Sequence, residues 1–179
     1  MRERKVAKRY AVATLDSIRD KGEMERVGKE LQTFAEVYSA NAELRKVMAH
    51  PGFSAKTKRG ILEKLSARLS FSAKTAKALD SFLRRGRIDL AADIAEDYSA
   101  LLDEKLGRQR VVVTSAYPLT DAETKELEKL FSSITGKRAV LDVGVDKSLI
   151  GGVVARVGGA VYDGSVKNQL EKMRIKAEV

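Results

Sequence analysis

Apolar residues recur at helical spacing through the first 105 positions of the chain. Arg4–Arg19 and five later segments each carry these residues along one side, which is typical of amphipathic helices that pack into a core. Ser54 and Ser72 stand where their side chains can cap two of these helices, and Gly86 fits the left-handed position that ends a helix. We therefore expect residues 1–105 to form a compact six-helix bundle with short connections.

The apolar pattern changes from helical to extended after the sixth of these segments. Arg110–Ala116 and Ala139–Val145 are rich in β-branched residues and predict two strands. Between them, Thr120-x-x-Glu123 has the spacing of a capping box and predicts the start of a helix. Residues 106–179 therefore predict a small C-terminal α/β domain, and the whole chain is expected to be α+β.

A pair of glycines, Gly158-Gly159, separates two short β-rich runs, Val153–Val157 and Ala160–Tyr162. The central residues of a two-residue hairpin turn need a positive φ, which glycine adopts without strain. This spacing therefore predicts a glycine hairpin near the end of the C-terminal domain.

A second pair, Gly151-Gly152, stands just before the first of these runs. Glycine at such a position indicates a bulge or a close approach of two backbone segments. Ser165 can cap a final helix that begins at Val166, and Asp163 is expected to serve the turn before it. We interpret these two glycines, the aspartate and the serine first as determinants of the fold.

Several residues of the C-terminal stretch form a set with a distinctive order: Asp146, Leu149-Ile150-Gly151-Gly152, Arg156, Gly158 and Asp163-Gly164-Ser165. This set resembles the C-terminal signature of the delta subunit of F-type ATP synthases, whose mitochondrial relative is the oligomycin-sensitivity-conferring protein. In the first half of the chain, the residues that match the same family are Val6-Ala7, Tyr10-Ala11 and the corner Gly86-Arg87-Ile88. The order and spacing of these pieces extend the resemblance over nearly the whole chain.

The resemblance implies a non-catalytic stator subunit that links the catalytic head of ATP synthase to its peripheral stalk. Through this link, proton-driven rotation is coupled to ATP synthesis. In the family, the first and fifth helices of the bundle hold the N-terminal helix of an alpha subunit, and the C-terminal part engages the b subunits. The resemblance further implies one copy in a hetero-oligomeric complex, peripheral to the cytoplasmic face of the cell inner membrane.

The resemblance also assigns residues to these two interfaces. The residues on the two matching helices, predicted to receive the alpha-subunit helix, are Val6, Tyr10, Ala13, Ala78 and Phe82. For all five, ordinary packing in the core of the bundle is the alternative interpretation, above all for Val6 and Phe82. The residues predicted to contact the stalk, in addition to their role in the fold, are Gly151, Gly152, Asp163 and Ser165.

The sequence lacks the residue sets that catalysis, metal binding or a cofactor would require. It contains no Cys, which excludes thiolate metal sites and cysteine catalysis. His50 is the single histidine and is expected to lie in a loop rather than to bind a metal. Asp142, Asp146 and Asp163 are too scattered to form an acid–base pair, and no glycine-rich phosphate loop precedes a helix. We therefore expect no enzyme activity, no metal and no cofactor.

The formal net charge of +9 raises the alternative of a basic nucleic-acid-binding module. The excess is spread thinly, because residues 1–105 hold 22 basic and 16 acidic residues and the remainder holds 12 and 9. Five cations crowd the start of the first helix, either as a solvated end or as a basic rim beside a groove for an acidic or amphipathic partner: Arg2, Arg4, Lys5, Lys8 and Arg9. We expect no nucleic-acid partner.

No apolar run approaches the roughly 18 residues that a membrane span needs. The first ten residues are basic, but the apolar segment of a signal peptide does not follow them. We therefore expect a protein on the cytoplasmic side that does not insert directly into the membrane.

Overall fold

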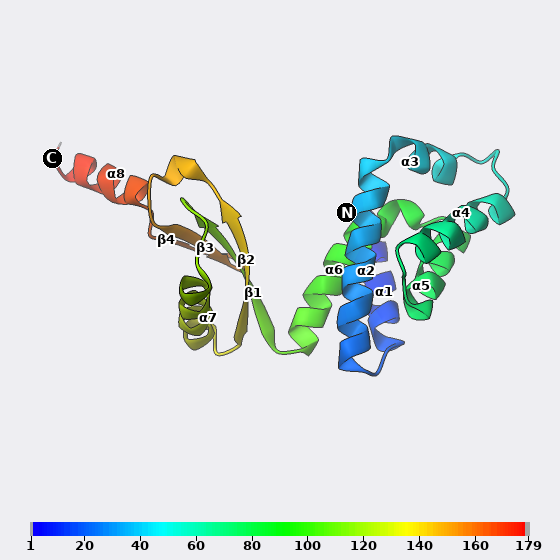
Figure 1. Ribbon diagram of the computed structural model, residues 1–179, viewed down its shortest axis with the longest axis horizontal. Helices are drawn as coiled ribbons and strands as arrows, with labels where there is room; N and C mark the ends of the chain where they lie inside the picture. The colour runs from blue at the N-terminus through cyan, green and yellow to red at the C-terminus, as the bar shows by residue number, and fades with distance from the viewer. Residues whose placement is uncertain (1, 178–179) are drawn as a thin grey trace. The chain divides into compact units, whose positions relative to one another are not determined.

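The computed structural model describes residues 2–177 and divides into two compact units, Met1–Leu102 and Asp103–Val179 (Figure 1). The N-terminal unit is helical, and the C-terminal unit is built on a four-stranded sheet. The α+β class predicted from the sequence is therefore confirmed. Within the part of the chain that the structure describes, no helix is both long and apolar enough to cross a bilayer.

The helices of the first unit follow one another with short connections. They are α1 (Arg2–Asp16), α2 (Lys21–Ala40), α3 (Ala42–Ala49), α4 (Ala55–Arg68), α5 (Ala73–Arg84), the 3-10 turn η1 (Ile88–Leu90) and α6 (Ala91–Lys105). Ser54 and Ser72 cap α4 and α5 as predicted, since each side chain accepts a hydrogen bond from the backbone N–H three residues later. The first helix ends three residues before its predicted end at Arg19, because Asp20 caps α2 and the chain must turn before it.

Helix α2 is one of the amphipathic helices expected from the sequence, and it buries one side: Met24, Val27, Leu31, Phe34, Ala35 and Tyr38. Helix α6 packs closely against α2 because Gly28 has no side chain, and a Cβ there would lie 3.2 Å from Cε1 of Tyr98. The Tyr98 ring is fully buried, and its hydroxyl donates a hydrogen bond of 3.0 Å to the carbonyl oxygen of Met24. This pair of contacts fixes α6 on α2.

Replacement of Tyr98 by Phe is expected to lower the free energy of unfolding by about 1 kcal/mol, because one buried hydrogen bond is lost. Burial, and next the nearby Glu23 carboxylate, raise the pKa of Tyr98 to about 12. Folding therefore favours the neutral phenol, and this contribution is complete below pH 10 and is lost as the pH rises toward 12. Urea titrations of wild type and Tyr98→Phe from pH 8 to 12 measure how this contribution changes with pH. A constant difference between wild type and Tyr98→Phe across that range would contradict the prediction.

The second unit contains β1 (Arg108–Ser115), α7 (Asp121–Thr135), β2 (Arg138–Val145), the 3-10 turn η2 (Lys147–Leu149), β3 (Val153–Val157), β4 (Ala160–Asp163) and α8 (Val166–Ala177). The strand order is β2-β1-β3-β4. Strands β1 and β2 are parallel and α7 connects them, whereas β3 is antiparallel to both β1 and β4. Val157 lies opposite Ala160, so Gly158-Gly159 joins β3 to β4. The sequence predicted a positive φ at both glycines, but only Gly158 has one, at +57°.

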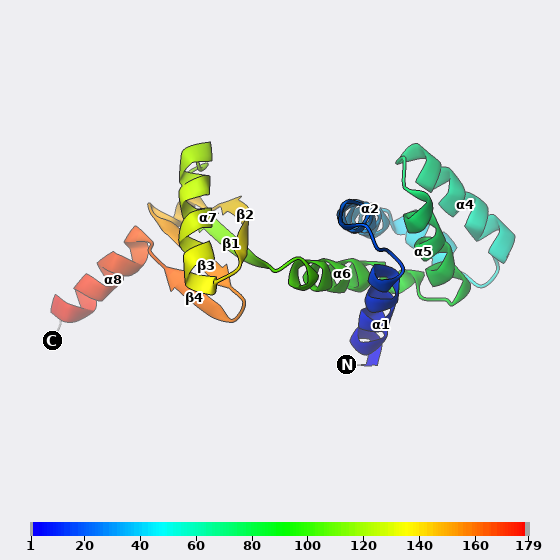
Figure 2. The same cartoon turned by 90° about the horizontal axis from the view of Figure 1, so that it is seen from below.

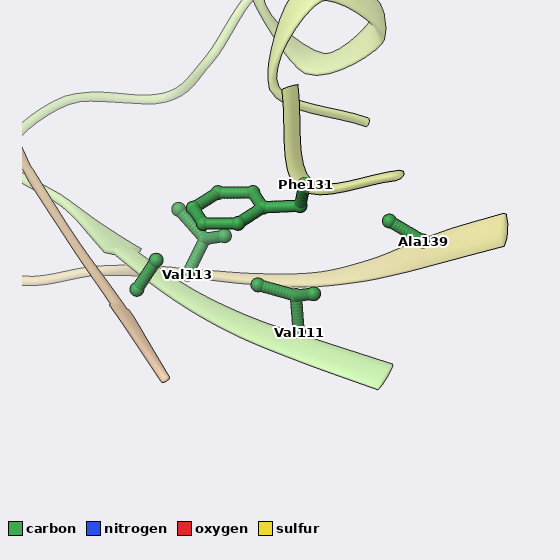
Figure 3. Packing of buried hydrophobic residues seen from close by; sticks show 5 residues of the cluster. Val111, Val113, Phe131 and Ala139 are labelled. Carbon is green, nitrogen blue, oxygen red and sulfur yellow. The ribbon is translucent and has the colours of Figure 1, made fainter. Parts of the chain in front are cut away.

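Figure 2 shows α7 lying across one face of the sheet. The core on this face consists of Val111, Val113, Phe131, Ala139 and Ala155. Phe131 of α7 lies over the two valines of β1 (Figure 3). The capping box predicted from Thr120 and Glu123 begins α7, with both reciprocal hydrogen bonds present.

Candidate partner-binding site

Helices α1 and α5 form the walls of an open groove of about 700 Å³. Val6, Tyr10 and Ala13 line it from α1, and Ala78 and Phe82 line it from α5. The structure therefore brings together all five residues that the sequence assigned to the groove helices. That they bind a partner stays a prediction.

The floor of this groove is aromatic and apolar. Tyr10 and Phe82 meet edge to face, with their ring centroids 5.5 Å apart at an interplanar angle of 85°. Phe82 is 1% exposed, so it belongs to the core of the unit as well as to the floor. Thr14 and Ser17, which also line the groove, donate their hydroxyl hydrogens to carbonyl oxygens within α1. Because Thr14 and Ser17 are small and their hydroxyl hydrogens are already bonded, they leave room for an apolar segment in the groove.

The rim of the groove is cationic. Its charged lining residues are Arg9, Lys74, Lys77, Arg85 and Arg87, and no acidic residue lines it. Among the described side chains, no carboxylate forms an ion pair with any of these five cations. The rim therefore presents unneutralised positive charge to whatever lies in the groove.

Of the cations expected to form a rim at the start of the first helix, only Arg9 lines the groove, and the cations of α5 were not predicted. Lys74, Lys77 and Arg85 recur at intervals of three and eight residues, and Ser81 fills the remaining turn on the same side. That spacing marks one face of a helix and could have been found from the sequence. A count of charges over residues 1–105 does not show this face, because it averages α5 with segments that carry more acidic residues.

The four residues assigned to the stalk interface meet where β3 begins and α8 begins. Val166 donates its backbone N–H to the carbonyl oxygen of Gly151, at 3.0 Å. Gly152 has φ +78°, and a Cβ there would lie only 2.3 Å from the carbonyl oxygen of Gly164. The close backbone approach expected from this glycine pair is thus confirmed.

Asp163 and Ser165 complete the same corner. The Ser165 backbone N–H donates to Oδ1 of Asp163 at 2.9 Å, and hydrogen bonds from Ser165 lower the pKa of this carboxyl. Ser165 is 2% exposed and caps α8, since its Oγ accepts from the backbone N–H of Asn168 at 3.2 Å. These contacts attach α8 to the sheet, which is the fold-determining role that the sequence predicted.

The described polar side chains outside these two sites include no candidate metal site. Within residues 2–177, no group of three or more His, Asp or Glu side chains could hold a metal ion. His50 is exposed at the end of α3, where its Nδ1 accepts a hydrogen bond from the backbone N–H of Gly52. It is thus a loop residue, as expected.

A known family has this combination of a helical unit and a small sheet with paired glycines. The family described as "ATP synthase delta (OSCP) subunit" matches residues 6–176. The chain belongs to this family. It is 38% identical over 169 residues to the ATP synthase subunit delta of Geobacter metallireducens and 37% identical to that of Geotalea uraniireducens, with 94% of each chain covered. The resemblance seen in the sequence is confirmed.

A solved structure shares the fold. A chain of the cryo-EM structure of the Toxoplasma gondii mitochondrial ATP synthase hexamer superposes with a TM-score of 0.65, at 24% identity, over 97% of both chains. The delta (OSCP) family is a non-catalytic subunit of the membrane-associated ATP synthase, and it acts as part of the stator. The prediction of a non-catalytic stator subunit is therefore confirmed.

Proposed function

We propose that this delta-family chain binds the N-terminal helix of an alpha subunit in the groove between α1 and α5, and binds the b subunits through its second unit. One copy would then join the catalytic head to the peripheral stalk, on the cytoplasmic face of the inner membrane. Held in this way, the head resists the torque of proton-driven rotation. The observation that carries the proposal is the groove, with its apolar floor and cationic rim.

A helix is the occupant that fits the groove best. An amphipathic helix is about 10 Å across with its side chains, and it docks by laying apolar residues at positions i, i+3, i+4 and i+7 into such a floor. The aromatic floor accepts that apolar stripe, while Ala13 and Ala78 let the backbone approach. The cations of the rim favour an occupant with acidic residues beside its stripe.

The second unit offers apolar surface for the stalk. Val166, Leu170 and Met173 of α8 are 37%, 52% and 68% exposed. Their spacing of four and three residues places them on one side of the helix. An exposed apolar stripe of this kind marks a protein interface, and the b subunits are the proposed occupants. Asp163 and Ser165 position this helix.

We also propose that the two units are separate folding domains, divided at residues 105 and 106. The six helices of the first would form one bundle, and Gly158-Gly159 would act as the hairpin turn of the second. Two domains suit a link between two partners, because each can be shaped for its own partner.

The test is calorimetric titration of the full chain with the N-terminal peptide of the same organism's alpha subunit, at about 50 and 200 mM salt. We expect saturable one-to-one binding whose Kd rises less than about tenfold between these conditions, because exposed ion pairs at the rim contribute little beside apolar burial. A random-sequence DNA duplex serves as the comparison ligand.

The outcome that would overturn the proposal is an absence of peptide binding together with strong binding to DNA. Neutralising six or more phosphates would weaken DNA binding by about a thousandfold or more over the same salt range. That result would favour the basic nucleic-acid-binding module instead.

A further inference from the structure

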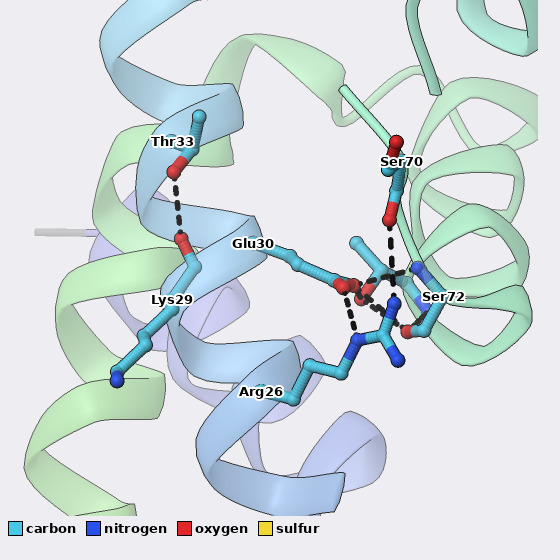
Figure 4. Close-up of polar contacts among 7 residues, drawn as sticks. Arg26, Lys29, Glu30, Thr33, Ser70 and Ser72 are labelled. Carbon is cyan, nitrogen blue, oxygen red and sulfur yellow. Dashed lines mark hydrogen bonds and ion pairs between the residues drawn. The ribbon is translucent and has the colours of Figure 1, made fainter. Parts of the chain in front are cut away.

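An ion-paired glutamate on α2 holds the start of α5. Glu30 Oε2 accepts hydrogen bonds from the Ser72 backbone N–H at 2.9 Å, the Ser72 hydroxyl at 2.8 Å and the Thr75 hydroxyl at 2.5 Å. Its Oε1 accepts from Nε of Arg26 at 2.7 Å, and Nη2 of Arg26 donates to the Ser70 carbonyl oxygen at 3.3 Å. Figure 4 shows these side chains converging from α2 on the turn before α5. We call this set the α2 clamp.

The centre of the α2 clamp is the Glu30 carboxylate, which is largely shielded from water and hydrogen-bonded at both oxygens. The Glu30 side chain is only 12% exposed, and both of its oxygens are used. Burial acts to raise the pKa of Glu30, but the hydrogen bonds from Thr75, Arg26 and Ser72 outweigh burial and lower it. Hydrogen bonds to a charged, partly buried group are stronger than neutral ones. The clamp therefore ties together segments that lie more than 40 residues apart in the chain.

The clamp acts on the same first turn of α5 that begins the groove wall. Thr75 is fully buried against Glu30, while its neighbours Lys74, Lys77 and Ala78 line the groove. Ser72 caps α5 and also donates its backbone N–H and its hydroxyl to the Glu30 carboxylate. The position of this turn relative to α2 therefore determines where the rim cations and the wall lie.

We propose that Glu30 is a positioning residue for the groove: it fixes the first turn of α5 so that the groove is already formed before its partner helix arrives. This inference rests on the proposed function, since it concerns the binding of that helix. When only a fraction of molecules has a formed groove, the apparent Kd equals the intrinsic Kd divided by that fraction. Releasing the clamp therefore weakens binding without removing any residue that touches the partner.

The experiment compares the full-length wild type with Glu30→Ala, Glu30→Gln and the control Tyr98→Phe. The control removes a buried hydrogen bond between α2 and α6 and leaves α5 untouched. Calorimetry with the alpha-subunit N-terminal peptide gives the Kd, and hydrogen exchange of the free proteins reports the opening of residues 73–78.

We expect Glu30→Ala to raise the Kd about tenfold and to speed hydrogen exchange at residues 73–78. The reason is that the fraction of molecules with a formed groove falls. Glu30→Gln keeps an acceptor for Thr75 and Ser72 but loses the charge that Arg26 needs, so it should restore part of the affinity. Tyr98→Phe should lower thermal stability with no change in Kd. If Glu30 contributed only to general stability, peptide binding would be weakened equally in Glu30→Ala and Tyr98→Phe.

The outcomes separate the two proposals. If the wild type does not bind the peptide, the proposed function fails, and the inference that rests on it fails too. If the wild type binds and Glu30→Ala binds equally well, the positioning role is overturned while the proposed function stands. Unchanged exchange at residues 73–78 in Glu30→Ala would also overturn it.

Discussion

Replacement of Gly152 by Val is expected to unfold the C-terminal unit. The residue has φ +78°, a conformation that β-branched side chains avoid, and its new Cβ would lie 2.3 Å from the carbonyl oxygen of Gly164. Neither backbone segment can retreat, because Gly164 N–H donates to the Val153 carbonyl oxygen and Val166 N–H donates to that of Gly151. A loss of about 4 kcal/mol is expected from the combined strain and clash, which is at the upper end for single substitutions.

The measurement is thermal and urea unfolding of the full chain, with hydrogen exchange to locate the loss in residues 103–177. Gly159→Ala is the matched control, since Gly159 lies in the turn between β3 and β4, its φ is not positive, and a Cβ there meets nothing within 4 Å. It should unfold like the wild type. If Gly152→Val keeps native protection in the sheet and still binds the stalk, the corner has no structural role of the kind described.

Features decided within a few residues were predictable from the sequence. Ser54, Ser72 and Ser165 act as caps because each hydrogen bond closes within three residues. The capping box at Thr120 belongs to the same class, because Thr120 and Glu123 are three residues apart. Such interactions depend on local order alone, so a sequence pattern determines them.

Features that join distant segments were not predictable. The β-branched runs indicate strands, but nothing in their alternation says that β1 and β2 pair in parallel with Arg108 opposite Arg138. The role of Glu30 could not be predicted either, because a glutamate among polar residues on a helix is typical of a solvated side. Its partners lie 42 and 45 residues away, and only the packing of α5 on α2 brings them within reach.

The groove itself was predictable only in part. Tyr10 and Phe82 were assigned by resemblance to a family, and periodicity by itself could not separate groove from core. Phe82 belongs both to the core and to the groove, since its ring is buried and still forms part of the groove floor. A test of the groove must therefore change a residue that the fold does not need.

Ala13→Glu meets this requirement and is expected to weaken binding of the alpha-subunit N-terminal peptide by about a hundredfold, or roughly 2.7 kcal/mol. Ala13 lines the groove but is exposed in the free chain, and Glu has a helix propensity close to that of Ala. The fold should therefore tolerate the change. The longer side chain occupies space that the peptide needs, and its carboxylate neutralises rim cations such as Arg9 and Lys77 that would otherwise attract acidic residues.

The control is Ala67→Glu, which adds the same charge at an exposed position of α4 outside the groove. Calorimetry should give a wild-type Kd for this control, and thermal unfolding should show both variants folded. If Ala13→Glu binds the peptide as tightly as the control does, the alpha-subunit helix does not lie between α1 and α5. A hundredfold loss confined to Ala13→Glu would place the contact in the groove, since the two variants share the same substitution and the same net charge.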